Sequence, residues 1–176
     1  MYKTLFFVWL IFISLHCMAQ VNKTAIPMKK GKVHYEKGYI FTDSLKQDEL
    51  FKRALKWFKI DVPNAEKIKT SADKTNGEIT GTSIFKIVTS STGNYYLVRS
   101  VFKIMVYNSG YTFEANEFYE KPIESGISNE YSKIEYRWWD YRQGKPWSAE
   151  DETLFKGIIS DEAALMASLE EQLHNK

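Results

Sequence analysis

Cysteine is almost missing from this sequence of 176 residues. The single cysteine, Cys17, directly follows an apolar run at the N-terminus, in a segment that we expect to be cleaved off. Without it, the chain has no disulfide, no thiol nucleophile and no thiolate metal ligand. We therefore expect a fold stabilised by packing alone, and we expect no cofactor and no metal site.

Histidine is scarce as well, and the common catalytic motifs are missing. Beyond the N-terminal segment only His34 and His174 occur, and no H-E-x-x-H, P-loop, G-x-S-x-G or calcium-loop spacing is present. Acidic groups such as residues 150–152 and 170–171 fall where helix termini and solvated faces explain them. We predict that the protein is not an enzyme. The alternative is a hydrolase of envelope or extracellular material, because paired carboxylates meet in space rather than in sequence.

The sequence also lacks an excess of charge of either sign. It has 24 lysines and arginines against 22 acidic residues, and loss of Lys3 with the N-terminal segment brings the chain close to neutrality. A nearly neutral chain has no general attraction for polyanions. We therefore expect no nucleic-acid partner.

The N-terminus has the pattern of a secretory signal. Lys3 precedes the apolar run 5–15, which is too short for a membrane-spanning helix, and Cys17-Met-Ala19 supplies small residues for cleavage before Gln20. A lipoprotein anchored through Cys17 is the rival interpretation, but His16 stands where a small residue is wanted. We predict a signal peptide over 1–19, a linker over 20–32 and a single domain over 33–176. The mature protein would be periplasmic or extracellular, with no transmembrane segment.

The clearest helix in the pattern runs from Asp48 to Lys59. Its apolar residues fall on one continuous face and its basic residues on the other, as an amphipathic helix requires. Ser44 and Gln47 have the spacing of a capping box, and Val62-Pro63 gives an extended exit. The residues expected to be buried are Leu50, Phe51, Ala54, Leu55, Trp57 and Phe58.

Strand patterns surround this helix. We expect strands over 33–41, weakly over 67–70, and then over 79–88, 95–107 and 111–119, with Pro122 ending the last one. In 95–107 the even positions would face the core, interrupted only by Ser100, and odd positions such as Arg99 would face the wetter side. This order predicts an α+β domain: an antiparallel meander with a helix inserted after the first strand, plus a C-terminal helix.

The order of these elements resembles a known family. The relevant residues are Tyr39-Ile-Phe41 before the helix, an Asn-Gly turn before Ile79-Thr-Gly-Thr82, and Ser109-Gly-Tyr111-Thr-Phe113 after the long strand. They are similar to the exported bacterial family called domain of unknown function 4468, over a core of 37–122. That resemblance implies a fold like that of the TATA-binding protein. It implies no activity, and a fold does not by itself imply DNA binding.

The C-terminal part, 123–176, combines aromatic residues with arginines and then becomes helical. Alternation over 134–141 would send Tyr136 and Trp138 to the domain, and Arg137, Trp139 and Tyr141 outward. Arginines beside exposed aromatics are typical of partner-binding sites for a protein or a glycan. The residues predicted to bind are Arg137, Trp139, Tyr141 and Arg142.

The other interpretation of this segment is structural. Ile134, Tyr136 and Trp138 would then cover one end of the core while the arginines reach water. After it, Ser148 would cap a short helix interrupted at Gly157, and Ser160 would cap a final one. The apolar stripe of that final helix would be Ala163, Leu165, Met166, Leu169 and Leu173. Together these patterns predict an exported, non-catalytic binding or structural domain of the cell envelope.

Overall fold

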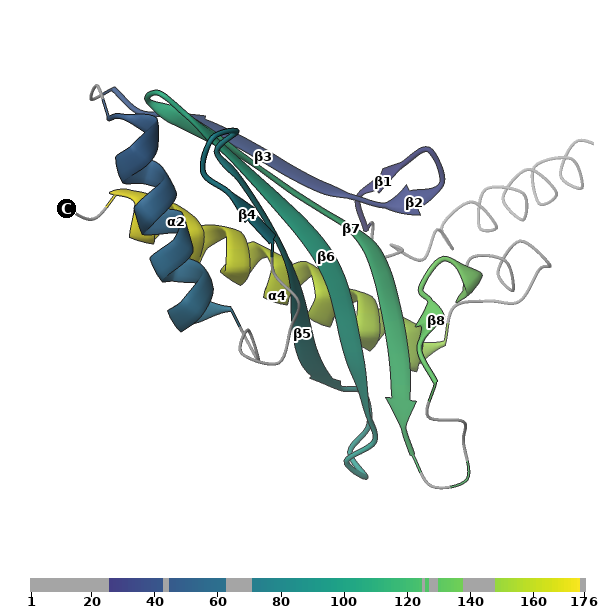
Figure 1. The fold of residues 1–176 in the computed structure, drawn as a ribbon. Helices are drawn as coiled ribbons and strands as arrows, with labels where there is room; N and C mark the ends of the chain where they lie inside the picture. Colours follow the sequence, from purple (N-terminus) through teal and green to yellow (C-terminus); the bar gives the residue numbers. More distant parts are fainter. Residues whose placement is uncertain are drawn as a thin grey trace, which may run out of the picture.

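The computed structural model describes residues 26–42, 45–62, 71–124, 126, 130–137 and 148–174. A sheet of six strands, all paired antiparallel, runs in the order β3-β7-β6-β5-β4, with β8 paired to β7 (Figure 1). The strands are β3 (Tyr35–Ile40), β4 (Ser71–Asp73), β5 (Glu78–Val88), β6 (Tyr95–Tyr107), β7 (Gly110–Ile123) and β8 (Ser132–Lys133). The predicted α+β meander is confirmed.

A small hairpin precedes the sheet. Its strands are β1 (Met28–Lys29) and β2 (Lys32–Val33), joined by Lys30 and Gly31, both with left-handed backbone. Ile26 and Val33 are buried in the core. The described end of the segment expected to be a linker therefore packs on the domain.

Helix α2 (Gln47–Asp61) packs on the sheet through the face that its sequence predicts. Leu50, Phe51, Ala54, Trp57 and Phe58 are all buried, whereas Lys52, Lys56 and Lys59 are exposed. The Trp57 ring meets the Phe102 ring of β6 edge-on at 5.7 Å, and its indole N–H donates to Ser168 Oγ at 2.8 Å. Trp57 thus joins α2 both to the sheet and to the second helix.

Helix α4 (Ala149–His174) is one continuous helix of 26 residues, so the expected break at Gly157 is wrong. Gly157 lies over β5, where an added Cβ would come within 2.5 Å of Ile87 Cγ2. Glycine here permits close packing of helix on sheet rather than ending the helix. None of the described helices is long and apolar enough to span a membrane.

The prediction of which residues form the apolar stripe of the last helix is partly wrong. The stripe runs along the whole of α4 rather than along a separate final helix. Leu165, Leu169 and Leu173 are buried, but Ala163 is exposed. The buried row also includes a charged residue type, Glu162, in the middle of the helix. The full row is Leu154, Phe155, Ile158, Glu162, Leu165, Leu169 and Leu173.

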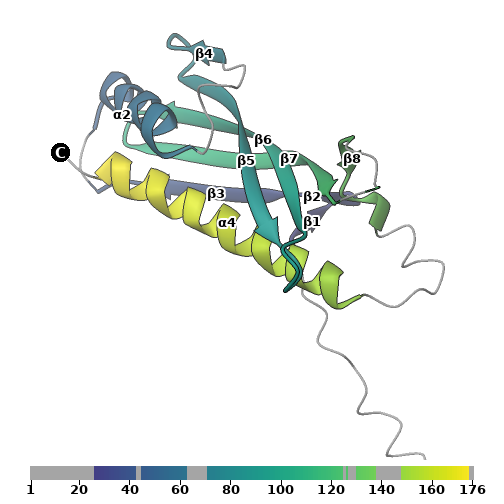
Figure 2. The same ribbon diagram turned by 90° about the horizontal axis from the view of Figure 1, so that it is seen from below.

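Both helices cover the same face of the sheet. Val98, Phe102 and Ile104 of β6 are buried on that face, as the alternation predicts. Phe102 contacts α2 through Trp57, and Ser100 contacts α4 through Glu162. Figures 1 and 2 show α4 running across this side of the sheet, and no helix of the described residues covers the opposite face.

A β-bulge in β7 shifts its pairing with β6. Arg99 pairs with Tyr119 and Val101 with Asn116, so β7 has one residue more than β6 between these pairs. Glu117 takes up the extra length with left-handed backbone at φ +53°. The strand also continues through Pro122, which pairs with Tyr96, so the predicted end at Pro122 is wrong. In the described chain β8 pairs only with Tyr119 and Glu120, so Pro122 has a strand on one side only, where a proline is tolerated.

Candidate functional site

The helix-free face of the sheet is built from alternate residues of its long strands. It carries the odd-numbered residues of β6 and the even-numbered residues of β5 that pair with them. Many of its side chains are partly exposed, and Val88 at the end of β5 is 51% exposed. This face is therefore the accessible side of the sheet.

The bulge decides which residues of β7 reach this face. Before it, Tyr111, Phe113 and Ala115 point to the helices and are buried. After it the parity is reversed, so that Phe118 and Glu120 are buried while Tyr119 and Lys121 join the helix-free face. An inserted residue is a known way to redirect the side chains that follow it.

Arg99 lies at the centre of the resulting cluster. Its guanidinium carbon lies 4.7 Å from the centroid of the Tyr119 ring and 4.7 Å from that of Tyr131. Such contacts orient the guanidinium and stabilise its charge. Its Nε is buried and has no hydrogen-bond partner among the described residues.

Two lysines flank Arg99 on the same face. Lys86 Nζ lies 4.2 Å from the Tyr95 ring centroid, and Lys121 Nζ lies 5.8 Å from that of Tyr131. Both lysines stand opposite Leu97, one on each neighbouring strand. We call this set the Arg99 patch: Lys86, Tyr95, Leu97, Arg99, Tyr119, Lys121 and Tyr131.

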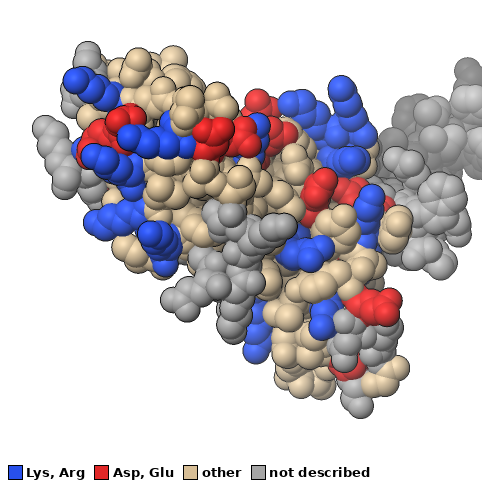
Figure 3. Space-filling model, in the orientation of Figure 1, with Lys and Arg blue, Asp and Glu red and all other residues tan. Residues whose placement is uncertain are grey.

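Within the described chain, Lys86, Arg99 and Lys121 form no ion pair with a carboxylate. Elsewhere on the same face charges are paired, as in Lys103 with Glu78 at 2.7 Å. Figure 3 shows acidic and basic side chains crowded together across the upper part, whereas lower down the lysines and arginines lie mostly among uncharged residues, with acidic side chains toward the lower right. The Arg99 patch is thus a cationic and aromatic surface without internal counter-ions.

Arg137, predicted to contact a partner, is held inside the protein instead. Its Nε donates to Glu120 Oε2 at 2.6 Å, its Nη1 donates to Asp151 of α4, and its guanidinium lies 4.8 Å from the Tyr96 ring centroid. The side chains of Arg137 and Glu120 are 18% and 9% exposed. Burial raises the pKa of Glu120 against the opposing effect of Arg137. This cluster ties residues 130–137 to β7 and α4.

The expected alternation is reversed at Tyr136 and Arg137. Tyr136 is 63% exposed and Arg137 is the more buried of the two, because 134–135 form a turn and 136–137 are helical rather than extended. Ile134 is buried, which agrees with the structural interpretation of this segment. The other predicted contacts, Trp139, Tyr141 and Arg142, lie outside the described residues, as does Trp138.

The most perturbed carboxyl group belongs to Glu162, on the covered face. Its Oε1 accepts a hydrogen bond from Ser100 Oγ at 2.7 Å, and Ser100 Oγ lies 2.7 Å from Ser83 Oγ on the neighbouring strand. Glu162 Oε2 has no partner among the described residues. Burial raises the pKa of Glu162 to about 7, although the hydrogen bond from Ser100 opposes this shift. The group lies within the core, so we assign it a structural role.

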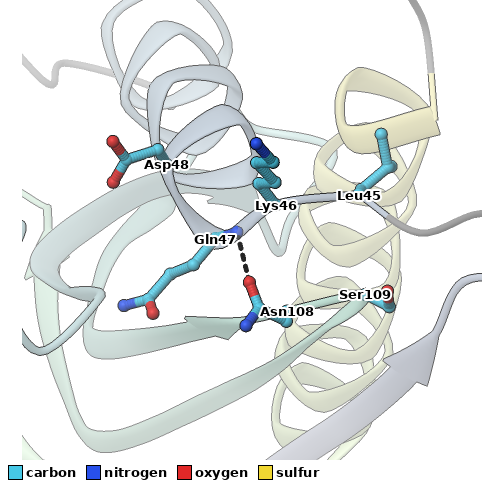
Figure 4. Close-up of a pocket in the computed structure, with 6 residues that line it drawn as sticks. All are labelled: Leu45, Lys46, Gln47, Asp48, Asn108 and Ser109. Atoms are coloured by element: carbon cyan, nitrogen blue, oxygen red, sulfur yellow. Dashed lines mark hydrogen bonds between the residues drawn. The ribbon is translucent and has the colours of Figure 1, made fainter.

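A hollow of about 700 Å³ opens at the start of α2, but its polar groups are already engaged. The Gln47 amide donates to Asn108 Oδ1 at 3.0 Å, which caps the helix, and the Ser109 amide donates to the Leu45 carbonyl at 2.7 Å. In Figure 4 the side chains of Lys46 and Asp48 point away from Asn108 instead of converging on it. Nothing in this arrangement forms a ligand site. Ser44, of the expected capping box, lies outside the described residues.

Four of the five acidic groups considered for a hydrolase have partners within the domain. Asp151 pairs with Arg137 and accepts from Ser148, Glu152 pairs with Lys156 at 2.6 Å, Glu170 pairs with Lys37, and Glu150 accepts from Thr89. Among the residues that the structure describes, no cluster of histidine, cysteine or acidic side chains could hold a metal ion.

Sequence reasoning placed Arg99 on the wetter side of its strand but did not single it out. Tyr119 and Lys121 were missed because their facing depends on the bulge. The left-handed residue at the bulge is Glu117, which no turn-forming residue type marks. Tyr131 was included in the aromatic segment, but its partner Arg99 is distant in sequence.

Comparison with known proteins gives a family and a fold. Residues 37–121 match the family model described as a domain of unknown function (DUF4468) with a TBP-like fold. No curated protein sequence matches the chain.

Two solved structures share the architecture. A TBP-like protein from Parabacteroides distasonis superimposes with a TM-score of 0.69 at 18% identity, over 85% of this chain and 97% of that one. A DUF4468 family protein from Bacteroides ovatus gives a TM-score of 0.68 at 16% identity, over 89% and 93% of the two chains. At such identities the likeness shows the fold alone, which confirms the TBP-like fold implied by the resemblance.

Proposed function

Residues 37–121 belong to the DUF4468 family of domains of unknown function, and from this premise we propose that the protein is an exported, non-catalytic binding domain of the cell envelope. Its binding surface is the helix-free face of the sheet. Trp139, Tyr141 and Arg142 remain further proposed partner residues on the evidence of the sequence alone.

The observation that carries the proposal is the asymmetry of the sheet. The covered face buries its apolar residues against α2 and α4, whereas the other face leaves Ile84, Leu97 and Val101 partly exposed and Val88 more so. Aliphatic and aromatic side chains gathered on an uncovered surface are typical of interaction sites.

Export follows from the N-terminal pattern and can be tested directly. We expect the secreted protein to begin at Gln20 or next to it, as N-terminal sequencing of the exported form will show. Retention of residues 2–15, or a lipid on Cys17, would contradict the proposal.

The binding face can be tested by site-specific photo-crosslinking in the native envelope. A photoreactive amino acid replaces Val88 on the helix-free face, and in a matched control it replaces Ala167, an exposed small residue of α4. We expect a discrete crosslinked product from position 88 and none from position 167. Equal products from both positions, or none from position 88, would overturn the assignment of this face.

A further inference from the structure

We propose that the ligand of the Arg99 patch is a protein that presents an acidic, partly apolar surface segment, with Arg99 as the residue that anchors it. This inference rests on the proposed function and names the chemistry of the partner. It is based on the unpaired charges of the patch, on the immobilised guanidinium and on the aliphatic residues around it.

The Arg99 patch carries unpaired positive charge. Lys86, Arg99 and Lys121 each face an aromatic ring, and within the described chain none of them meets a carboxylate. Cations that stay unpaired in the isolated protein are complementary to an acidic partner, which gains attraction without having to displace an internal acid. An arginine also presents a planar fork that matches a carboxylate with two parallel hydrogen bonds.

The Arg99 side chain is immobilised before any ligand binds. Arg99 is held between Tyr119 of β7 and Tyr131, the residue directly before β8. A long side chain that is already immobilised loses little conformational entropy when it binds. The two rings hold the guanidinium in a position where its buried Nε has no hydrogen-bond partner among the described residues. A buried donor of this kind calls for an explanation, and preorganisation for a ligand supplies one.

Aliphatic residues around Arg99 favour a protein as the ligand over a polyanion or a glycan. Leu97 lies within the patch, with Ile84 next to Arg99 and Ile123 next to Tyr95 on the adjoining strands. Aliphatic side chains mixed with tyrosine and arginine are typical of protein interfaces. Toward Lys103 the same face carries Glu78 and Glu114, so a long nucleic acid would find no continuous row of unpaired cations there.

Nuclear magnetic resonance titration of the mature protein tests the inference with defined probes. The first probe is a ten-residue peptide of alternating glutamate and leucine, the second has glutamine in place of glutamate, and the third is an oligogalacturonate. We expect the glutamate peptide to shift the amide signals of residues 97–99 and 119–121, and to bind at least about ten-fold more tightly than the other two. Raising the salt concentration from about 50 to about 500 mM should weaken it several-fold.

Two variants show whether Arg99 is the anchor. Arg99→Met should weaken the glutamate peptide by about ten-fold or more, whereas Lys156→Met, which removes an exposed cation from α4, should leave its affinity unchanged. Equal affinity for the glutamine peptide, preference for the oligogalacturonate, or no binding of any probe at millimolar concentration would overturn the inference. Crosslinking from position 88 would still support the proposed face in those cases, so the two failures can be told apart.

Discussion

Arg99 and Ser100 are neighbours in the chain, yet they point to opposite faces of the sheet and into different chemistry. Ser100 turns to the covered face, where its hydroxyl donates to the buried carboxyl group of Glu162. Arg99 turns to the helix-free face, where two tyrosine rings hold its charge without a counter-ion in the described chain. Strand β6 thus carries the Ser100 hydroxyl, which is hydrogen-bonded within the fold, next to the Arg99 guanidinium, which has no ion-pair partner in the described chain.

This contrast separates stability from recognition. On the covered face the hydroxyls of Ser83 and Ser100 are hydrogen-bonded within the protein, because an unmatched buried polar group lowers the free energy of unfolding. On the helix-free face Lys86, Arg99 and Lys121 are exposed or partly exposed and have no carboxylate partner in the described chain. Changes on the covered face should therefore lower stability, and changes on the other face should alter binding.

The largest effect is expected at the centre of the covered face. Trp57→Ala or Phe58→Ala should each lower the free energy of unfolding by about 3–5 kcal/mol, because each removes a buried aromatic ring. Lys56→Ala, between them in sequence and exposed, should change it by less than about 0.5 kcal/mol. Denaturant unfolding measures all three, and equal midpoints would show that the buried face of α2 is assigned wrongly.

The fold of this central region was predictable because burial of one side of each element leaves a regular spacing of apolar residues in the sequence. The apolar face of α2 and the alternation of β6 follow from burial against a single layer, and both are confirmed. α4 was predicted less well, because the sequence does not show whether Gly157 ends a helix or makes room for the Ile87 side chain of β5. Only the approach of another element decides between these roles.

The next effect depends on pH and concerns Glu162. Its pKa in the folded protein is about 7 against an ordinary 4.5, so its contribution to stability is full below about pH 4.5 and is lost as the pH rises to about 7. Glu162→Gln imitates the protonated form and removes this loss. At pH 8 the variant should be more stable than the wild type by up to about 3 kcal/mol, and near pH 4 the two should be alike. Parallel stability curves across this range would contradict the assignment.

An intermediate effect is expected where the two faces meet, at Arg137. Arg137→Met would leave the Glu120 carboxylate buried without its cation, at a loss of about 2–3 kcal/mol in the free energy of unfolding. The double variant with Glu120→Gln should recover part of this loss, as a double-mutant cycle measures. A loss of binding with unchanged stability would instead restore the original expectation that Arg137 contacts a partner.

A smaller effect is expected at the bulge that builds the Arg99 patch. Glu117→Gly places the residue type best suited to left-handed backbone and should raise the free energy of unfolding by up to about 1 kcal/mol. Thr112→Gly, in a regular part of the same strand, should lower it by a similar amount. If both glycines destabilise the protein equally, the backbone at Glu117 is not left-handed in solution.

The site was less predictable than the fold because it depends on that bulge. Strict alternation along β7 would send Tyr119 to the same side as Phe113 and away from Arg99, and a single extra residue reverses this. Tyr131 lies directly before β8, and no local pattern in the sequence reveals the pairing of β8 with β7 that brings it to Arg99. The pattern around Arg137 predicted exposure of its side chain because it assumed a strand, whereas 134–135 form a turn and 136–137 are helical.

The smallest effect on stability coincides with the largest effect on binding, at Arg99. Arg99→Met gives up two ring contacts worth about 0.5–1 kcal/mol each, but it also removes an unsatisfied buried donor worth about 1–3 kcal/mol. We therefore expect the free energy of unfolding to change by less than about 1 kcal/mol. Thermal and denaturant unfolding of the variant beside the wild type measure this change.

The most direct test of the account compares the two neighbours in one binding measurement. The affinity for the glutamate–leucine peptide is measured for Arg99→Met and for Ser100→Ala, under conditions in which both variants are folded. The account predicts a loss of about ten-fold or more for Arg99→Met and wild-type affinity for Ser100→Ala, even though Ser100→Ala is the less stable protein. Wild-type affinity for Arg99→Met, or an equal loss in both variants, would contradict the separation of stability and recognition between the two faces.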